Sequence, residues 1–338
     1  MHKDNSKQKW TSFFRNTLNL RILFVVLILV IILSVLSPVF RSKRNIVENV
    51  LRPSALIAII SIGMTFIISS RGLDLSVGSN AALSSVIGVL AILDLGFPIW
   101  LGILLGLFAG AIFGVFNAFF ITKIKVPPFI VTFATLSIGR GMTLVFSGNL
   151  FTYGLPDKFR DLGRGSIIGI PTPIIILIIL WIFSYYLFNQ TRFGRYARAI
   201  GANEQAARVS GIEIDKYKML FYIFIGILSA LGGLIASARS NVIEMQTGLG
   251  YELDAIASVI LGGTTLAGGT GSITGSILGA IMLKILSNGL QLIGVDTFIQ
   301  KVVVGVIIIA GLAYAAWQNE QSKKTARRQM TEELQKTE

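Results

Sequence analysis

The stretch ILFVVLILVIILSVL, residues 22–36, has Ser34 as its only polar residue. A helix needs about 20 mostly apolar residues to cross a hydrocarbon core of about 30 Å, because each residue rises about 1.5 Å. This run therefore predicts a membrane-spanning helix near 21–40. Further segments pass the same test, so the sequence predicts an all-α polytopic membrane protein with ten spans. The other nine predicted spans lie near 51–70, 77–94, 98–122, 127–147, 172–190, 217–237, 252–267, 272–292 and 298–317.

The composition of the 338-residue chain supports this fold class, with 53% hydrophobic and only 14% charged residues. Soluble domains carry about 25% charged residues, so an ordinary globular protein is excluded. The formal net charge of +13 raises the question of nucleic-acid binding. Most of the excess basic residues lie between the apolar runs, as in membrane proteins, so we expect membrane lipid and no nucleic acid among the partners.

The basic residues also orient the chain. With the N-terminus inside, the predicted cytoplasmic segments hold 19 Lys and Arg and the external segments 8. Cytoplasmic loops are enriched in these residues, so we expect both termini in the cytoplasm. Two features fit less well, since the basic cluster in 41–52 lies outside and the short, Gly-rich span 252–267 suggests a broken or re-entrant helix. The predicted parts are a cytoplasmic N-terminal tail (1–20), a transmembrane domain (21–317) with a cytoplasmic loop (191–216), and a charged cytoplasmic C-terminal tail (318–338).

Glycine recurs at every fourth position in the fourth and ninth predicted spans. Small faces let helices approach closely in lipid, so we interpret these glycines as helix-packing faces, with lining of a solute path as the alternative. Each stripe lies in the fourth span of one half of the chain and is followed by an asparagine. We therefore formulate the hypothesis of an inverted repeat of two five-helix halves. The glycines are Gly102, Gly106, Gly110, Gly114, Gly271, Gly275 and Gly279, and the asparagines are Asn117 and Asn288.

Several chemistries lack the residues that they need. The single histidine, His2, lies in the polar N-terminal tail, and the chain has no cysteine. Histidine-dependent catalysis and thiolate metal sites are therefore not expected. No G-x-x-x-x-G-K-[ST] motif occurs, so the glycine-rich region near 262–279 is not a nucleotide-binding P-loop. We predict no enzymatic activity, no cofactor and no metal.

Polar residues within the spans are candidates for a translocation path, because charge in the membrane is costly. In RGLDLSVGS (71–79), either Asp74 or Ser76 caps the following helix, or Asp74 acts in solute passage or gating. Arg140 either pairs with an acid such as Asp74 or donates hydrogen bonds to a hydroxyl-rich solute. Lys284 is expected to snorkel toward the interface. The candidate path residues are Asp74, Ser76, Asn80, Asn117, Arg140 and Asn288.

The longest cytoplasmic loop contains TRFGRYARAIGANEQAARVSGI, residues 191–212. Its sequence predicts a two-turn helix with Asn203 as N-cap, a Glu204/Arg208 pair and Gly211 at the C-terminal end. The segment is too polar to insert into a membrane. It is either a solvated loop helix or a docking element for a cytoplasmic partner.

Four segments together resemble a known family. They are RGLDLSVGS (71–79), VPPFIVTFATLSIGRGM (126–142), GANEQAARVSGI (201–212) and YELDAIASVILGGTTLAGGTGSITGSILGA (251–280). The chain, over residues 45–317, resembles the permease subunits of ATP-binding-cassette (ABC) sugar importers of the ribose/xylose/autoinducer-2 group, which are related more distantly to branched-chain amino-acid permeases. Arg71 departs from this pattern, because the family usually has a glycine there.

The resemblance implies a permease homodimer in the bacterial cell membrane, with two cytoplasmic ATPase domains and an extracytoplasmic sugar-binding protein. It implies import of a ribose-like monosaccharide by alternating access. An ABC permease for branched-chain amino acids and an ion-coupled secondary transporter are the alternatives, and the second is disfavoured because Asp74 and Asp254 lie near span ends. The resemblance also makes 201–212 a coupling helix for the ATPase, at which a bulky side chain in place of Ala207 would uncouple transport. The residues of this helix are Gly201, Asn203, Glu204, Gln205, Ala206, Ala207, Arg208 and Gly211.

Overall fold

The computed structural model describes residues 4–148, 152–243 and 246–296, together with parts of a helical segment between 298 and 313. The predicted tenth span is thus described only in part, and the C-terminal tail 318–338 lies outside the described residues. At the other end of the chain, α1 runs from Asp4 to Leu36, so the predicted N-terminal tail and first span belong to one helix. Side chains are described from residue 19 onward.

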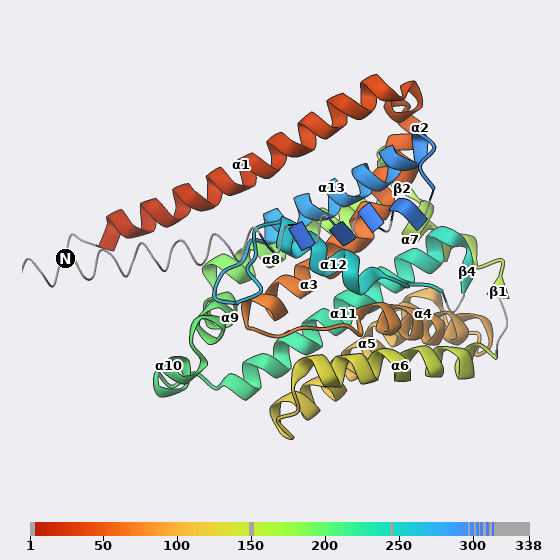
Figure 1. The fold of residues 1–338 in the computed structure, drawn as a ribbon. Helices are drawn as coiled ribbons and strands as arrows, with labels where there is room; N and C mark the ends of the chain where they lie inside the picture. Colours follow the sequence, from red (N-terminus) through yellow and green to blue (C-terminus); the bar gives the residue numbers. More distant parts are fainter. Residues whose placement is uncertain are drawn as a thin grey trace, which may run out of the picture.

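The described part of the chain is almost entirely helical (Figure 1), which confirms the all-α fold class. Seven helical segments are long and apolar enough to cross a membrane, so a polytopic membrane protein is confirmed, although fewer full spans are present among the described residues than the ten predicted. After α1 the helical elements are η1 (Pro38–Arg41), α2 (Lys43–Asn45), η2 (Ile46–Leu51), α3 (Arg52–Ser69), α4 (Val77–Leu93), α5 (Ile99–Thr122), α6 (Pro128–Ser147), α7 (Asp157–Arg164), α8 (Thr172–Gln190), α9 (Arg192–Ala202), α10 (Glu204–Val209), α11 (Ile214–Ser240), α12 (Tyr251–Leu261) and α13 (Ile273–Leu292).

Two short antiparallel strand pairs tie loops together. Strand β1 (Thr152–Tyr153) pairs with β4 (Val242–Ile243), with Thr152 opposite Ile243. Strand β2 (Ser166–Ile167) pairs with β3 (Ile170–Pro171), with Ser166 opposite Pro171. Each strand has only two residues, so the pairs fasten loops and do not form a layer of the fold.

Helix α3 lies at the centre of the bundle (Figure 1), and nearly all of its residues are buried. A helix that is apolar all round is expected to be enclosed by other helices. It continues η2 and α2, so the helical segment begins at Lys43 and not near residue 51. The prediction began too late because Arg44, Glu48 and Arg52 interrupt the apolar pattern. Arg52 is nevertheless buried, where it bonds Glu48 at 3.1 Å and the carbonyl oxygen of Gly163 at 2.7 Å.

The glycine stripes lie where helices approach most closely. On α5, a Cβ at Gly102 would overlap the carbonyl oxygen of Gly88 in α4, and one at Gly114 would overlap Tyr222 in α11. On α13, Gly279 lies against Ser258 of α12. The Cβ of any other residue would have to push these backbones apart. The stripes thus position α4, α11 and α12 against their neighbours.

Helices α4 and α12 do not cross the whole bundle. The connection after α3 runs into the bundle before α4 begins at Val77 (Figure 1). Helix α12 has 11 residues and ends at Leu261, which corresponds to a length of about 16 Å and about half of a hydrocarbon core. The segment 252–267 is therefore broken, as the alternative interpretation of its sequence expects. Gly262 and the turns after it lead to α13.

The loops gather at two opposite ends of the bundle. At one end Arg71 donates to the carbonyl oxygens of Ala202 and Ala267, and Lys125 pairs with Asp215 of α11 at 2.7 Å. Helix α10 lies at this end, and α2, α7, β1 and β4 lie at the other (Figure 1). The segments 71, 123–126 and 191–216, which the charge pattern assigns to the cytoplasm, share the α10 end.

Candidate functional site

A buried turn precedes α4 and holds the acid of the RGLDLSVGS segment. Asp74 is 3% exposed, and its Oδ1 accepts hydrogen bonds from the backbone N–H of Ser76 at 2.8 Å and from Ser76 Oγ at 2.5 Å. Ser76 occupies the N-cap position but makes no capping side-chain hydrogen bond. The expectation that Asp74 or Ser76 caps α4 is therefore wrong, because Asp74 closes a turn one step before the helix.

Two asparagines extend this polar cluster into neighbouring helices. Asn117 of α5 donates to Ser76 Oγ at 2.8 Å, while its own Oδ1 is buried without a hydrogen-bond partner among the described residues. Asn80 donates to the carbonyl oxygen of Gly226 at 3.1 Å and accepts from Ser84 at 2.8 Å. The structure thus brings Asp74, Ser76, Asn80 and Asn117 together at the junction of α4, α5 and α11.

Arg140 lies at a second polar point, where the N-termini of α4 and α12 meet. Its guanidinium donates to the carbonyl oxygen of Thr247 at 2.6 Å and interacts electrostatically with Glu252, in the first turn of α12. Glu252 Oε2 is buried without a hydrogen-bond partner in the described parts of the chain and lies against Gly78, whose added Cβ would be 2.5 Å from it. A carboxylate at a helix N-terminus is electrostatically favourable. The acid near Arg140 is therefore Glu252, in place of the suggested Asp74.

Sequence reasoning did not single out Glu252. The signal was present, because the segment YELD places two acids directly before an apolar run, and ionisable residues at membrane depth are functional candidates by default. The second acid, Asp254, pairs with Lys284 of α13 at 2.7 Å. Both side chains are about three-quarters buried, so Lys284 forms an internal ion pair and the snorkelling prediction is wrong.

Asn288 does not join either polar point. It exchanges hydrogen bonds with Asn45, at 2.8 and 3.0 Å, and both side chains are nearly fully buried. The pair fixes α13 to α2, at the end of the bundle opposite α10 (Figure 1). The sixth predicted path residue thus has a separate position in the fold.

Helix α10 is an exposed helix with defined ends. Asn203 accepts a hydrogen bond from the N–H of Ala206 at 3.0 Å, which confirms the N-cap. The N–H groups of Gly211 and Ile212 donate to the carbonyl oxygens of Arg208 and Ala207, with Gly211 at φ +81°. This is the Schellman arrangement, for which glycine is favoured because it adopts positive φ without strain. The helix is thus closed at both ends by its own sequence.

Charged contacts hold α10 against the bundle. Glu204 pairs with Arg208 at 3.6 Å, as predicted, and also with Lys218 of α11 at 2.7 Å. Beside the helix, Arg208 and Lys123 line a hollow of about 480 Å³. The exposed face of α10 carries Gln205, Ala206 and Val209, and the side chain of Val209 is 90% exposed.

Two of the predicted contact residues do not lie on that exposed face. Ala207 is 5% exposed and packs against the core under α10, and Gly201 is also buried. A bulky residue at Ala207 would therefore push α10 away from the bundle, and its effect would not report on an outside partner. The exposed face of α10 instead lies around Ala206.

The backbones of three segments approach one another closely beneath α10. Gly201 packs against the backbone of Ser69 at the end of α3, and the N–H of Gly269 donates to the carbonyl oxygen of Ser69 at 2.9 Å. Arg71 has φ +60°, in the left-handed region. This explains why a glycine suits that position. In this backbone conformation the guanidinium of Arg71 donates to the carbonyl oxygens of Ala202 and Ala267.

Comparisons with known proteins show which family the chain resembles. A family model described as "Branched-chain amino acid transport system / permease component" matches residues 46–312. The chain is 44% identical to the ribose import permease protein of Bacillus subtilis, over 83% of this chain and 88% of that protein. It is 39% identical to the ribose import permease protein of Escherichia coli, over 85% and 90%, and 34% identical to the D-allose transport system permease protein of Escherichia coli, over 86% and 89%.

Proposed function

The chain belongs to the branched-chain amino acid transport system permease family, and from that premise we propose that it forms the path by which an ABC importer takes up ribose or a closely related monosaccharide. A permease component is a transport subunit of the cell membrane and not an enzyme. The observation that carries the choice of ribose is the 44% identity to a permease named for that sugar. Identity falls for the relatives named for allose and xylose, so ribose is favoured over them.

The partners proposed are cytoplasmic ATPase subunits, an extracytoplasmic sugar-binding protein and a second copy of the permease. The chain contains no P-loop motif, so the energy of ATP must reach it across an interface. Helix α10 suits that interface, because it is rigid at both ends and exposes Gln205, Ala206 and Val209. Its ion pair with Lys218 connects it to α11, which reaches the Asp74 region through Tyr222.

The proposed path passes two polar points, the turn that precedes α4 and the N-terminus of α12. Asp74 lies at the first of these points and Arg140 with Glu252 at the second. Carboxylate and guanidinium groups exchange hydrogen bonds with hydroxyl groups, which a monosaccharide carries on most of its carbons. Glu252 retains acceptor capacity there, because its Oε2 makes no hydrogen bond to a described residue. Asn80 instead acts as an interhelical anchor, since its amide donates to the carbonyl oxygens of Gly226 in α11 and of Gly110 in the glycine stripe of α5.

We also propose the finer topology, with both termini in the cytoplasm and an inverted repeat of five helices. Helix α4 corresponds to the third of the ten predicted spans and α12 to the eighth, so each is the third span of its half. Both helices are short, and short spans at corresponding positions of two repeats typically form the binding site. Helix α5 packs against α4 and α11, and α13 packs against α12 and α3. Interchanging the two halves turns the contacts of α5 with α4 and α11 into the contacts of α13 with α12 and α3. A two-fold axis in the membrane plane requires this correspondence.

The test is ATP-driven uptake in proteoliposomes that contain this permease, its ATPase subunits and its binding protein. We expect uptake of radiolabelled ribose that requires ATP and is competed by unlabelled ribose. Competition by leucine but not by ribose would assign the transporter to branched-chain amino acids. Uptake driven by an ion gradient without ATPase subunits would contradict the proposal.

A further inference from the structure

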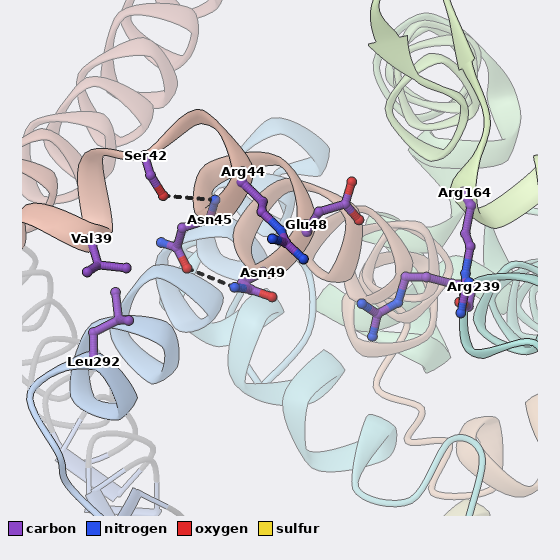
Figure 2. Close-up of a pocket in the computed structure, with 9 residues that line it drawn as sticks. All are labelled: Val39, Ser42, Arg44, Asn45, Glu48, Asn49, Arg164, Arg239 and Leu292. Carbon is purple, nitrogen blue, oxygen red and sulfur yellow. Dashed lines mark hydrogen bonds between the residues drawn. The ribbon is translucent and has the colours of Figure 1, made fainter.

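A basic pocket lies at the end of the bundle opposite α10. It is a half-open hollow of about 800 Å³ between α2, η2, the end of α13 and the loops at α7 and α11. Figure 2 shows that Arg44, Arg164 and Arg239 approach it from three separate segments. The proposed sugar path does not use these residues.

The charge of the pocket is strongly positive. Glu48, the one acid among the described residues that line the pocket, is paired with the buried Arg52 at 3.1 Å. Arg164 is fixed by hydrogen bonds to the carbonyl oxygens of Arg239 and Ser240, which leave its positive charge uncompensated. In the described residues neither Arg44 nor Arg239 has an acidic partner. Three guanidinium groups therefore face one hollow in which the described residues supply a single carboxylate, and that carboxylate is already paired with Arg52.

The floor of the pocket is rigid and supplies further polar groups. Asn45 is buried and bonds Asn288, while Asn49 donates to Asn45 at 2.9 Å (Figure 2). Ser42 accepts from the N–H of Asn45 at 3.2 Å. Arginine forks match the oxygens of a phosphate group closely. Asn45 donates to Phe40 and Asn288 and so holds the floor in place, while the hydroxyl of Ser42 and the amide of Asn49 lie at the hollow as neutral polar groups. An anion with several oxygens fits this set of groups.

The surroundings of the pocket are apolar and exposed. Val35, Leu36 and Val39 are 79%, 58% and 58% exposed at the end of α1, and Val39 and Leu292 line the pocket itself. The apolar run of α1 ends here, so the pocket lies at the level where hydrocarbon gives way to headgroups. A ligand at this level would meet cationic and apolar groups side by side. A soluble protein would have to enter the headgroup layer to reach the same place.

We propose that this pocket binds the phosphate of an anionic membrane phospholipid, with the acyl chains along the exposed end of α1. This assignment gives a direct role to Arg44, which belongs to the basic cluster of 41–52 that opposes the general charge orientation of the chain. Clusters of basic residues near a membrane surface attract anionic lipid. The proposal rests on the pocket and is independent of the sugar that is transported.

The test uses the full-length permease in nanodiscs with equal amounts of phosphatidylglycerol and phosphatidylcholine, released for native mass spectrometry. The test variant is Arg44→Gln with Arg239→Gln, since neither side chain holds the fold together through an ion pair in the described residues. The matched control is Lys158→Gln, an exposed cation on α7 that does not line the pocket. A parallel thermal-unfolding series adds inorganic phosphate to detergent-solubilised protein.

We expect the wild type and the control to retain phosphatidylglycerol over phosphatidylcholine, and the double variant to lose about tenfold or more of that preference. Equal retention of both lipids by the wild type would overturn the proposal. So would an undiminished preference in the double variant. Stabilisation by free phosphate, without preferential lipid retention, would instead identify a site for a small anion. If the double variant in the same nanodiscs retains lipid unchanged but captures less of the sugar-binding protein than the wild type does, the lipid proposal is overturned and the pocket is assigned to that protein.

Discussion

Helix α10 begins after Asn203 and helix α4 begins after Ser76, but different interactions determine where the two helices begin. Helix α10 is capped by Asn203 from its own sequence and is closed after Val209 by the exposed Gly211. Helix α4 begins inside the bundle at Ser76, which makes no side-chain cap, and receives Glu252 from α12 against its first turn. The first start is therefore set locally, and the second is set by tertiary packing. Changes at the two places should differ in size and in kind.

The largest effect is expected at Gly78, in the first turn of α4. A Cβ there would overlap the carbonyl oxygen of Gly248 and lie 2.5 Å from Glu252 Oε2. Gly78→Val should therefore lower the free energy of unfolding by about 3 kcal/mol, because the α4–α12 contact cannot widen without moving backbone. Thermal unfolding in detergent measures this. Gly211→Ala is the matched change in α10, where no atom would be overlapped and only the positive φ is strained, at a cost of about 1 kcal/mol. Equal losses for the two variants would contradict the distinction.

The second-largest effect is expected for Asp74→Ala. It removes the acceptor for both hydrogen bonds from Ser76 and leaves a buried N–H without a partner, at a cost of about 2 kcal/mol. Asp74→Asn is the control, because an amide oxygen can still accept from the Ser76 N–H. Comparing unfolding and sugar uptake separates two roles: if Asn restores stability but not uptake, the carboxylate acts in transport. Full uptake by Asp74→Ala would remove Asp74 from the path.

Asn203→Ala tests the local start. Loss of the N-cap should cost about 1 kcal/mol, confined to α10. Amide hydrogen exchange should then rise in 204–209 and remain unchanged in α4. Asn203→Asp keeps an acceptor oxygen and should restore protection. A rise in exchange that spreads to α4 would show that the two starts are more tightly linked than described.

Glu204→Gln is expected to have the smallest effect. Its pairs with Arg208 and Lys218 are partly exposed, so their loss should cost about 0.5 kcal/mol and less at high salt. Unfolding at low and at high salt concentration measures the difference between wild type and variant. A loss above about 2 kcal/mol that does not respond to salt would mean that the pairs are not screened by water.

The difference between local and tertiary determinants also explains which features could be predicted from the sequence. The caps and the Glu204/Arg208 pair of α10 follow from residues three to five positions apart, so they could be predicted locally. Helix α7 could not, because its polar residues 157–164 give no span signal and its position depends on Arg52, more than a hundred residues earlier. The environment of Arg140 depends likewise on Glu252, and that of Lys284 on Asp254. Apolar periodicity predicts that a helix spans the membrane, but it does not predict which charged residue another helix will meet inside.

We propose that the exposed face of α10 receives the ATPase signal, and Ala206 tests this role most directly. Ala206 is exposed whereas Ala207 is buried, so Ala206→Trp alters the outside face without disturbing the packing beneath. In the reconstituted importer we predict that Ala206→Trp lowers ribose uptake per ATP hydrolysed by about tenfold or more, because a bulky side chain separates the two surfaces. Ala206→Ser should transport like the wild type. Wild-type uptake per ATP by Ala206→Trp, in an importer that still contains its ATPase, would contradict the account.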